Sequence, residues 1–411
     1  MVAFASDDDF QEFAQPGVGA YYAYLGSVDR IVVTPGRLAF RGRELLAHEL
    51  THHFTSYILP RTSPWLGEGL ACFVEPVGTF AIGAGVNVGT RPASRQLRMR
   101  RDRVPVAKIF AWDGSTRSDA SRHYDTAWLL VHYLVDRHEE FWSYLQRLSR
   151  GENPDAAWRA VFPAFDLQTP GGPDALESAL DDYVRAGVLR YRALDVKVET
   201  PPFQERILSP GQVHEIRLRL WPVRPGNGEA AALAAEIDET LGEAPGNPTA
   251  LRARTGRRTE EALPAARLAV KSHPGDWRAW SFLATVQRSG DPAESLQAWR
   301  RAVELAPDGA QALHGLAAAL LRGGQSGEAL PLARRAARLA PFSAAVVDNS
   351  AAVAADLGLC EEALSTQRRA LEILGERAAP MTRSEYTERL SNYEKQCAGE
   401  GTPATRVSPT P

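Results

Sequence analysis

The sequence is poor in lysine, in cysteine and in long apolar runs, and each shortage excludes a class of protein. Lysine occurs at four positions, so arginine supplies nearly all of the positive charge. The formal net charge of -3 gives no electrostatic basis for binding nucleic acid or an anionic membrane. Together with abundant alanine, glycine and proline, the arginine bias is typical of a GC-rich bacterial genome.

The three cysteines, Cys72, Cys360 and Cys397, are odd in number and widely spaced, without a CxxC pair. This pattern predicts isolated thiols rather than a disulfide framework or a zinc knuckle. The sequence also lacks any stretch of 18 apolar residues, so it predicts no transmembrane segment.

The first residues give two conflicting indications of cellular location. They lack the basic and long apolar regions of a signal peptide, which predicts a cytoplasmic protein for the sequence as it stands. The strand-like segment Val2–Ala5 follows Met1 at once, which instead predicts a truncated domain. The complete form would then be exported, to the periplasm or the cell envelope.

The second half of the sequence repeats every 34 residues. The period relates glycines, glutamates, leucines and alanines at equivalent positions, among them Gly290, Gly324 and Gly358; Glu294, Glu328 and Glu362; Leu296, Leu330 and Leu364; and Ala302, Ala336 and Ala370. This period, with small residues at fixed positions, is typical of tetratricopeptide (TPR) repeats. Each such helix pair buries its apolar face against the next pair, and the stack offers a groove to a protein partner.

A potential metal site lies in the helix predicted over residues 42–58. His48 and His52 are four residues apart there, so both imidazoles project from one face, one turn apart. This spacing suits two ligands of one tetrahedral Zn2+ ion. Glu49, next to the first histidine, is then placed to face a metal-bound water and to accept its proton.

Glu68 supplies the third ligand that a catalytic zinc site requires. It lies in a second predicted helix, within Trp65–Ala71, between two glycines that leave room at the metal. The sequence HELTH followed by WLGEGLA resembles the gluzincin metallopeptidases, in particular the bacterial peptidase MA-like group. The resemblance implies His48, His52 and Glu68 as zinc ligands and Glu49 as the general base. Fewer residues separate His52 from Glu68 here than in thermolysin or the zinc aminopeptidases.

A tyrosine adds to this resemblance. Tyr124 opens an apolar helix within Ser121–Leu130. In the gluzincins a tyrosine at the start of such a helix donates a hydrogen bond to the developing oxyanion, and the resemblance implies this role for Tyr124. A place in the hydrophobic core is the alternative for this side chain.

The two halves together predict a fold class and a domain organisation. The predicted fold is an α+β thermolysin-like (zincin) metallopeptidase domain, with a hairpin of residues 21–25 and 31–34 in its sheet, followed by an all-α TPR solenoid. The predicted boundaries are 1–200 for the metallopeptidase domain, 201–246 for a linker and degenerate helical pair, 247–375 for the repeats, 376–398 for a capping helix and 399–411 for a disordered tail.

The expected function is zinc-dependent hydrolysis of peptide bonds, with a peptide or protein as substrate and a protein partner in the TPR groove. Two alternatives stay open on the sequence. One is a non-catalytic zinc-binding TPR scaffold or adaptor, and the other is a zinc hydrolase with a different substrate. A closed structural site would need a fourth protein ligand, which the sequence does not offer in an obvious place.

Overall fold

The computed structural model describes residues 1–14, 18–25, 29–35, 40–59, 62–79, 85–90, 102–114, 120–187, 189–195, 207–223, 230–256, 259–375 and 379–399. The chain divides into two compact units. Unit 1 comprises Met1–Leu208 and Leu220–Gly228, and unit 2 comprises Ser209–Arg219 and Glu229–Pro411. The centre of the expected linker, at Pro201-Pro202, and the expected tail after Gly399 lie outside the described residues, so the predicted boundaries stay predictions.

The N-terminal strands of unit 1 form a small mixed sheet. Strand β3 (Asp29–Pro35) lies in its centre, parallel to β1 (Val2–Phe4) and antiparallel to β2 (Tyr21–Leu25). The antiparallel pair confirms the predicted hairpin. Helix α1 (Asp7–Gln11) follows β1, and helix α2 (Phe40–Ile58) contacts both β2 and β3.

Helices make up most of the rest of unit 1 and bury its core. They are α3 (Pro64–Val74), α6 (Val106–Phe110), α7 (Ala120–Asp136), α8 (His138–Ser149), α9 (Pro154–Val161), the 3-10 helix η1 (Pro163–Phe165), α10 (Gly172–Ala186) and the 3-10 helix η2 (Trp221–Val223). Helices α3 and α7 pack closely, because Gly69 lets the backbone of α7 approach; a Cβ there would lie 2.6 Å from the carbonyl oxygen of Ala127. Trp65, Leu66 and Trp128 are fully buried at this contact.

The second sheet of unit 1 is built from very short strands. Strand β5 (Val86–Val88) pairs antiparallel with β4 (Gly78–Thr79) and with β6 (Arg192–Leu194). Strands of two and three residues bury little apolar surface, so this sheet adds an edge to the helical core rather than a layer of its own.

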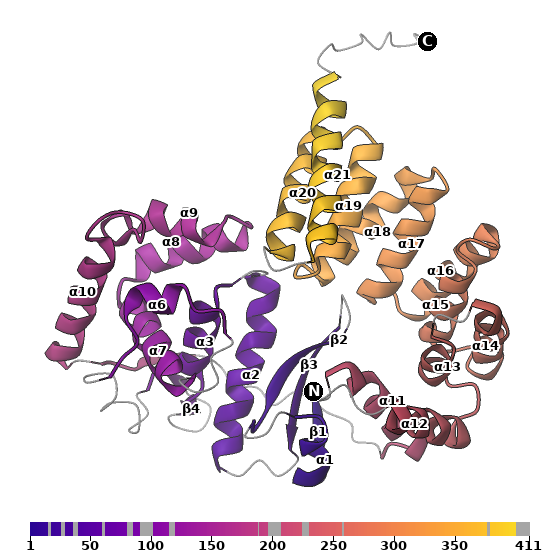
Figure 1. The fold of residues 1–411 in the computed structure, drawn as a ribbon, viewed down its shortest axis with the longest axis horizontal. Coiled ribbons are helices and arrows are strands. Elements are labelled where there is room, and N and C mark those ends of the chain that lie inside the picture. The colour runs from indigo at the N-terminus through magenta and orange to yellow at the C-terminus, as the bar shows by residue number, and fades with distance from the viewer. Residues whose placement is uncertain are drawn as a thin grey trace. The chain divides into compact units, whose positions relative to one another are not determined.

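Unit 2 is a series of antiparallel helices, drawn from red to yellow in Figure 1. They are α11 (Pro210–Leu220), α12 (Ala230–Glu243), α13 (Pro248–Thr255), α14 (Thr259–Ser272), α15 (Trp277–Val286), α16 (Pro292–Leu305), α17 (Ala310–Arg322), α18 (Ser326–Leu339), α19 (Ala344–Asp356), α20 (Cys360–Leu374) and α21 (Pro380–Gly399). Helices α16, α18 and α20 begin 34 residues apart, as the sequence period predicts. Their contacts are with neighbouring helices, which is the packing of a repeat array.

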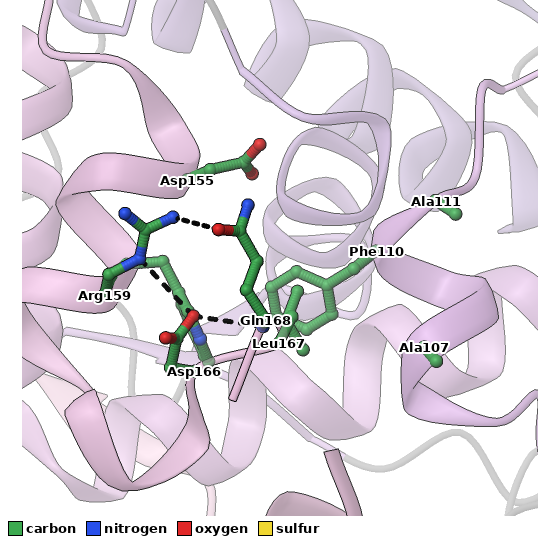
Figure 2. Close-up of a pocket in the computed structure, with 9 residues that line it drawn as sticks. Ala107, Phe110, Ala111, Asp155, Arg159, Asp166, Leu167 and Gln168 are labelled. Atoms are coloured by element: carbon green, nitrogen blue, oxygen red, sulfur yellow. Dashed lines mark hydrogen bonds and ion pairs between the residues drawn. The ribbon is translucent and has the colours of Figure 1, made fainter. Parts of the chain in front are cut away.

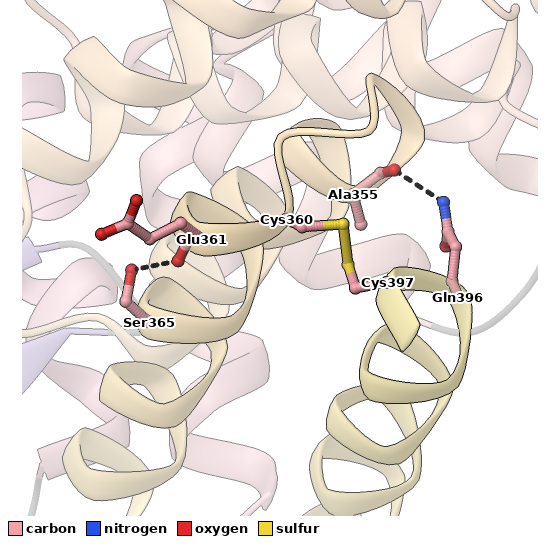
Figure 3. Close-up of a disulfide and its surroundings, with 6 residues drawn as sticks. All are labelled: Ala355, Cys360, Glu361, Ser365, Gln396 and Cys397. Atoms are coloured by element: carbon pink, nitrogen blue, oxygen red, sulfur yellow. Dashed lines mark hydrogen bonds between the residues drawn. A yellow bond between two sulfur atoms is a disulfide. The ribbon is translucent and has the colours of Figure 1, made fainter. Parts of the chain in front are cut away.

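The last helix of unit 2 is joined covalently to the one before it. Cys360, at the start of α20, and Cys397, near the end of α21, form a disulfide that closes a 37-residue segment (Figure 3). The prediction of isolated thiols is therefore wrong for these two cysteines, because antiparallel packing of α20 and α21 brings distant positions together. It holds for Cys72, which is free and buried.

The predicted fold class is wrong. The part of the chain that the structure describes contains 19 α-helices and six strands, the longest of seven residues, so the fold is nearly all helical. The physical reason is the composition of the core: in unit 1 its buried apolar side chains come mainly from helices packed on helices, not from a sheet. None of the described helices has the length and apolar character to cross a membrane.

Candidate metal centre

Helices α2 and α3 bring the three predicted metal ligands together. His48 and His52 project from one face of α2, and α3 packs against this helix and presents Glu68. The sheet supports the arrangement through Tyr22 of β2, whose hydroxyl lies 3.0 Å from Ser56 Oγ and whose ring stacks near His52. Each ligand is therefore held by an element that the sequence places correctly.

The donor atoms form a nearly equilateral triangle. His48 Nε2 lies 3.2 Å from His52 Nε2 and 3.2 Å from Glu68 Oε2, and His52 Nε2 lies 3.5 Å from Glu68 Oε2. Tetrahedral Zn2+ with ligand bonds of about 2.0–2.1 Å requires donor atoms roughly 3.3–3.4 Å apart. Two nitrogens and one carboxylate oxygen at this spacing fit the donor set of a zinc ion.

The charges of the three side chains are strongly coupled. Burial would raise the pKa of Glu68, but hydrogen bonds from His48 and His52 lower it to about 2. Burial would lower the pKa of His48, but Cys72, Glu68 and Glu75 together raise it well above its usual value. The raised pKa favours the protonated form of His48, so a metal ion that binds His48 Nε2 would have to displace a proton.

A second acidic residue supports His48 from the side away from this triangle. Glu75 Oε2 lies 3.4 Å from His48 Nδ1, and Cys72 Sγ lies 4.0 Å from the same nitrogen. A carboxylate that accepts the Nδ1 proton leaves Nε2 free to bind a metal ion. Sequence reasoning missed Glu75, although it follows Glu68 by seven residues and therefore lies two turns along the same face of α3.

Glu49 and Tyr124, the two predicted catalytic residues, also lie near the site. Glu49 is buried, and its pKa is raised by that burial. The Tyr124 ring packs edge-on against His48 with 6.3 Å between the ring centres, and burial, followed by the charge of Glu68, raises its pKa to about 12. Tyr124 also packs against the core of unit 1, which is the alternative that the sequence left open.

The flanking glycines have different roles from those expected. A Cβ on Gly67 would meet Thr62 Oγ1 at 3.6 Å and the His52 ring at 4.0 Å, which are ordinary contacts. A Cβ on Gly69 would collide with α7. The sequence predicted that both leave room for the metal, whereas Gly69 serves the packing of two helices.

Two other features could be mistaken for ligand sites. In unit 2, His214 Nδ1 lies 2.6 Å from Glu236 Oε1, but Arg217 also binds this glutamate, so an internal cation already balances it. In unit 1, a cavity of about 240 Å³ lies beside α9 (Figure 2). Arg159 at its rim is bonded to Gln168 and Asp166, so these polar groups satisfy one another.

Comparison with known proteins finds similarity among solved structures. No protein-family model and no curated protein matches the sequence. Among solved structures, similarity is found to the crystal structure of MamA protein, with 13% identity and a TM-score of 0.28 over 49% of this chain and 98% of that one. The crystal structure of yeast Tom70 shows 14% identity and a TM-score of 0.35, over 88% of this chain and 75% of that one.

The fold of the described residues contradicts the resemblance to the gluzincin metallopeptidases. The described fold is nearly all helical, whereas the resemblance implies an α+β domain built around a sheet. The prediction of a zinc metallopeptidase domain is therefore wrong, whereas the roles expected for Glu49 as general base and Tyr124 as oxyanion donor stay predictions. The motifs HELTH and WLGEGLA fix the local placement of three ligands, but two short motifs do not determine a domain or its activity.

Proposed function

We propose that this chain is a zinc-binding scaffold whose TPR-like repeats bind a protein partner. The observation that carries the proposal is the stack of helix pairs in unit 2, with its 34-residue period. Repeats of this kind form extended surfaces because each pair contacts its neighbours alone.

Zinc would have a structural role in unit 1, held by three protein ligands, so its fourth position would be left to a water molecule or a partner group. His48 and His52 lie on α2, next to the small sheet, whereas Glu68 lies on α3, which packs into the helical core. A single ion bound by all three would fasten α2 to α3, and the binding free energy would stabilise unit 1. The spacing of the donor atoms, close to the edge of a zinc tetrahedron, supports this assignment.

Metal analysis of the purified full chain tests the zinc site. We expect about one zinc per chain, and loss of the metal in the His48→Ala/His52→Ala variant, because a single ligand cannot hold the ion. His53→Ala is the matched control, since His53 lies on the same helix but packs against Phe54 and Tyr57. Full zinc occupancy in the double variant would refute the site.

A displayed peptide library tests the scaffold. Acidic, neutral and basic peptides are presented to the full chain, and bound peptides are cross-linked and mapped. We expect peptides that cross-link to α13–α19. A library that yields no binder would contradict the scaffold, whatever the outcome of the zinc experiment.

The disulfide supports an exported location over a cytoplasmic one. Disulfides form and persist in oxidising compartments and are rare in the cytosol. Thiol trapping in cells that make the protein would test this, with Cys360 and Cys397 expected to be protected from the reagent until they are reduced.

A further inference from the structure

One layer of unit 2 carries ion pairs that repeat with the helices. Arg300 NH2 of α16 lies 3.0 Å from Glu328 Oε1 of α18, and Arg334 Nε of α18 lies 2.7 Å from Glu362 Oε1 of α20. Arg368 of α20 pairs in the same way with Glu394 of α21, at 3.0 Å. Arg300 and Arg334 each have an acidic partner on the next helix of the same layer, and Arg368 has its partner on the capping helix α21.

The neighbouring layer, formed by α13, α15 and α17, carries a strip of arginines without such partners. Helix α13 contacts α15, and α15 contacts α17. Among the described residues, no carboxylate forms an ion pair with Arg252, Arg288 or Arg322. Glu294, which follows Arg288 in the chain, is bonded to Gln287 and Arg267 instead.

Arg252 lies at one end of this strip. Its NH2 group donates to the carbonyl oxygen of Ser281 at 3.4 Å and to Thr285 Oγ1 at 3.3 Å, and its guanidinium lies 5.3 Å from the centre of the Phe282 ring. Burial lowers the pKa of Arg252. A guanidinium that is largely enclosed and bonded to neutral oxygens costs free energy, which an anion would recover.

Arg288 and Arg322 continue the strip. Arg288 follows Thr285 by one turn, and Arg322 is the last residue of α17. Burial, and then the positive charge of Arg288, lower the pKa of Arg322. Two cations that repel each other at the ends of α15 and α17 disfavour the free protein and favour a negatively charged ligand. The strip ends at α19, because the position equivalent to Arg322 is occupied there by an acidic residue, Asp356.

We infer that Arg252, Arg288 and Arg322 form a docking strip for an acidic segment of a partner protein. The inference rests on the proposed scaffold function and specifies its partner. A peptide fits because successive carboxylates on an extended chain can reach arginines on successive helices, each in a charge-assisted hydrogen bond. The net charge of -3 shows that the strip does not result from a general excess of cations.

Fluorescence anisotropy with the full chain tests the strip. The probes are a labelled peptide that alternates Glu and Ser, its counterpart with Gln in place of Glu, and a labelled oligothymidine. We expect the acidic peptide to bind more tightly than both other probes, with an affinity that falls as salt is added. Arg288→Gln/Arg322→Gln should weaken this binding about tenfold, because each exposed ion pair contributes up to ~1 kcal/mol.

The matched control is Arg300→Gln/Arg334→Gln, which removes the same charge from the paired layer. It should leave peptide binding unchanged, and Arg288→Lys/Arg322→Lys should retain most of it. Three outcomes would each contradict the proposed docking strip. They are equal binding of the Gln and Glu peptides, equal losses of binding in the two Gln double variants, and tighter binding of the oligothymidine than of the acidic peptide. If the library yields peptides without acidic preference, the scaffold stands and this inference fails; if it yields none, the scaffold itself fails.

Discussion

Unit 1 and unit 2 are both built mainly by packing helix on helix, yet they place their charged groups differently. Unit 1 turns charged and polar side chains inward, so that His48, His52, Glu68 and Glu75 meet between α2 and α3. Unit 2 has alanine at many helix contacts and carries most of its arginines and glutamates on the outside, with the buried Glu236 and the largely enclosed Arg252 as exceptions.

The difference shows how each unit can be stabilised. Inward charges must be balanced, and in unit 1 the histidines and carboxylates of the site balance either one another or a bound cation. Outward charges in unit 2 need no balance for folding, so the repeats can hold an unpaired strip of arginines for a ligand. A covalent bond, Cys360–Cys397, closes the end of unit 2. We therefore expect metal to stabilise unit 1 and the disulfide to stabilise unit 2.

The largest expected effect is on unit 2. Cys360→Ser/Cys397→Ser should lower its free energy of unfolding by about 2–4 kcal/mol, because the bond restricts the unfolded chain over 37 residues. Urea denaturation followed by circular dichroism measures this. The wild type should become equally unstable in a phosphine reductant, and the variant should not respond to it. A wild-type unfolding transition with the same midpoint in the presence and absence of the reductant would contradict the disulfide.

The same substitution should have unequal effects in the two units. Gly69→Ala should destabilise unit 1 by about 1–3 kcal/mol, because the new methyl group meets the backbone of α7, which cannot move aside. Gly315→Ala in unit 2 should cost less, because the obstacle is the ring of Trp299. Gly67→Ala on α3 is the control and should stabilise the helix by up to ~1 kcal/mol. Equal losses at Gly69 and Gly67 would show that α3 and α7 are not in this contact.

Glu75 should affect metal binding without forming part of the donor triangle. Glu75→Ala should weaken zinc affinity about 10–100-fold, because His48 loses the acceptor that orients its ring. Competition with a chromophoric chelator measures the affinity. An unchanged affinity, with metal-free stability also unchanged, would rule out this supporting role.

Acidification should weaken unit 1 through His132. This histidine is almost fully buried and its Nδ1 lies 2.7 Å from the Tyr183 hydroxyl, and burial lowers its pKa. The unfolded chain then binds the proton more readily than the folded chain. The contribution to stability is complete above the unfolded value of about 6.5 and is lost as pH falls through the lower folded value. His132→Gln should show a flatter decline than the wild type in unfolding experiments between about pH 7 and 5. Parallel curves would contradict the prediction.

The smallest effects should separate the paired from the unpaired arginines. Arg300→Gln removes an exposed ion pair with Glu328 and should cost up to ~1 kcal/mol. Arg288→Gln removes one of two repelling charges and should leave the stability of unit 2 the same or slightly higher. Thermal melting at low salt measures both. A larger loss for Arg288→Gln would show that it has an acidic partner.

Much of the candidate site could be predicted because its signals are local. The spacing of His48 and His52 on one helix determines their common face, and Glu68 lies in a helix with its own clear start at Pro64. The repeat period likewise predicted where α16, α18 and α20 begin. These features depend on residues close together in the sequence, where propensity and periodicity are informative.

The remaining features depend on how distant segments pack. The contact between Glu75 and His48 requires the rotation of α3 against α2, and the pairing of Cys360 with Cys397 requires the antiparallel approach of α20 and α21. The fold class failed for the same reason, because two metal-site motifs say little about whether helices or strands bury the other apolar residues. The sequence did not reveal the arginine strip, because only the structure shows which arginines form ion pairs with glutamates and which do not.

The contact between Trp299 and Gly315 has a further consequence for the repeats. The ion pairs of α16, α18 and α20 recur, so a stack that slipped by one repeat would form them almost equally well. Thirty-four residues later, Ala333 and Asn349 stand at the positions of Trp299 and Gly315, and they cannot reproduce the fit of a large ring against a bare backbone. The contact between Trp299 and Gly315 therefore distinguishes the native stack from a stack that is shifted by one repeat. It favours a single folded register for a repetitive chain.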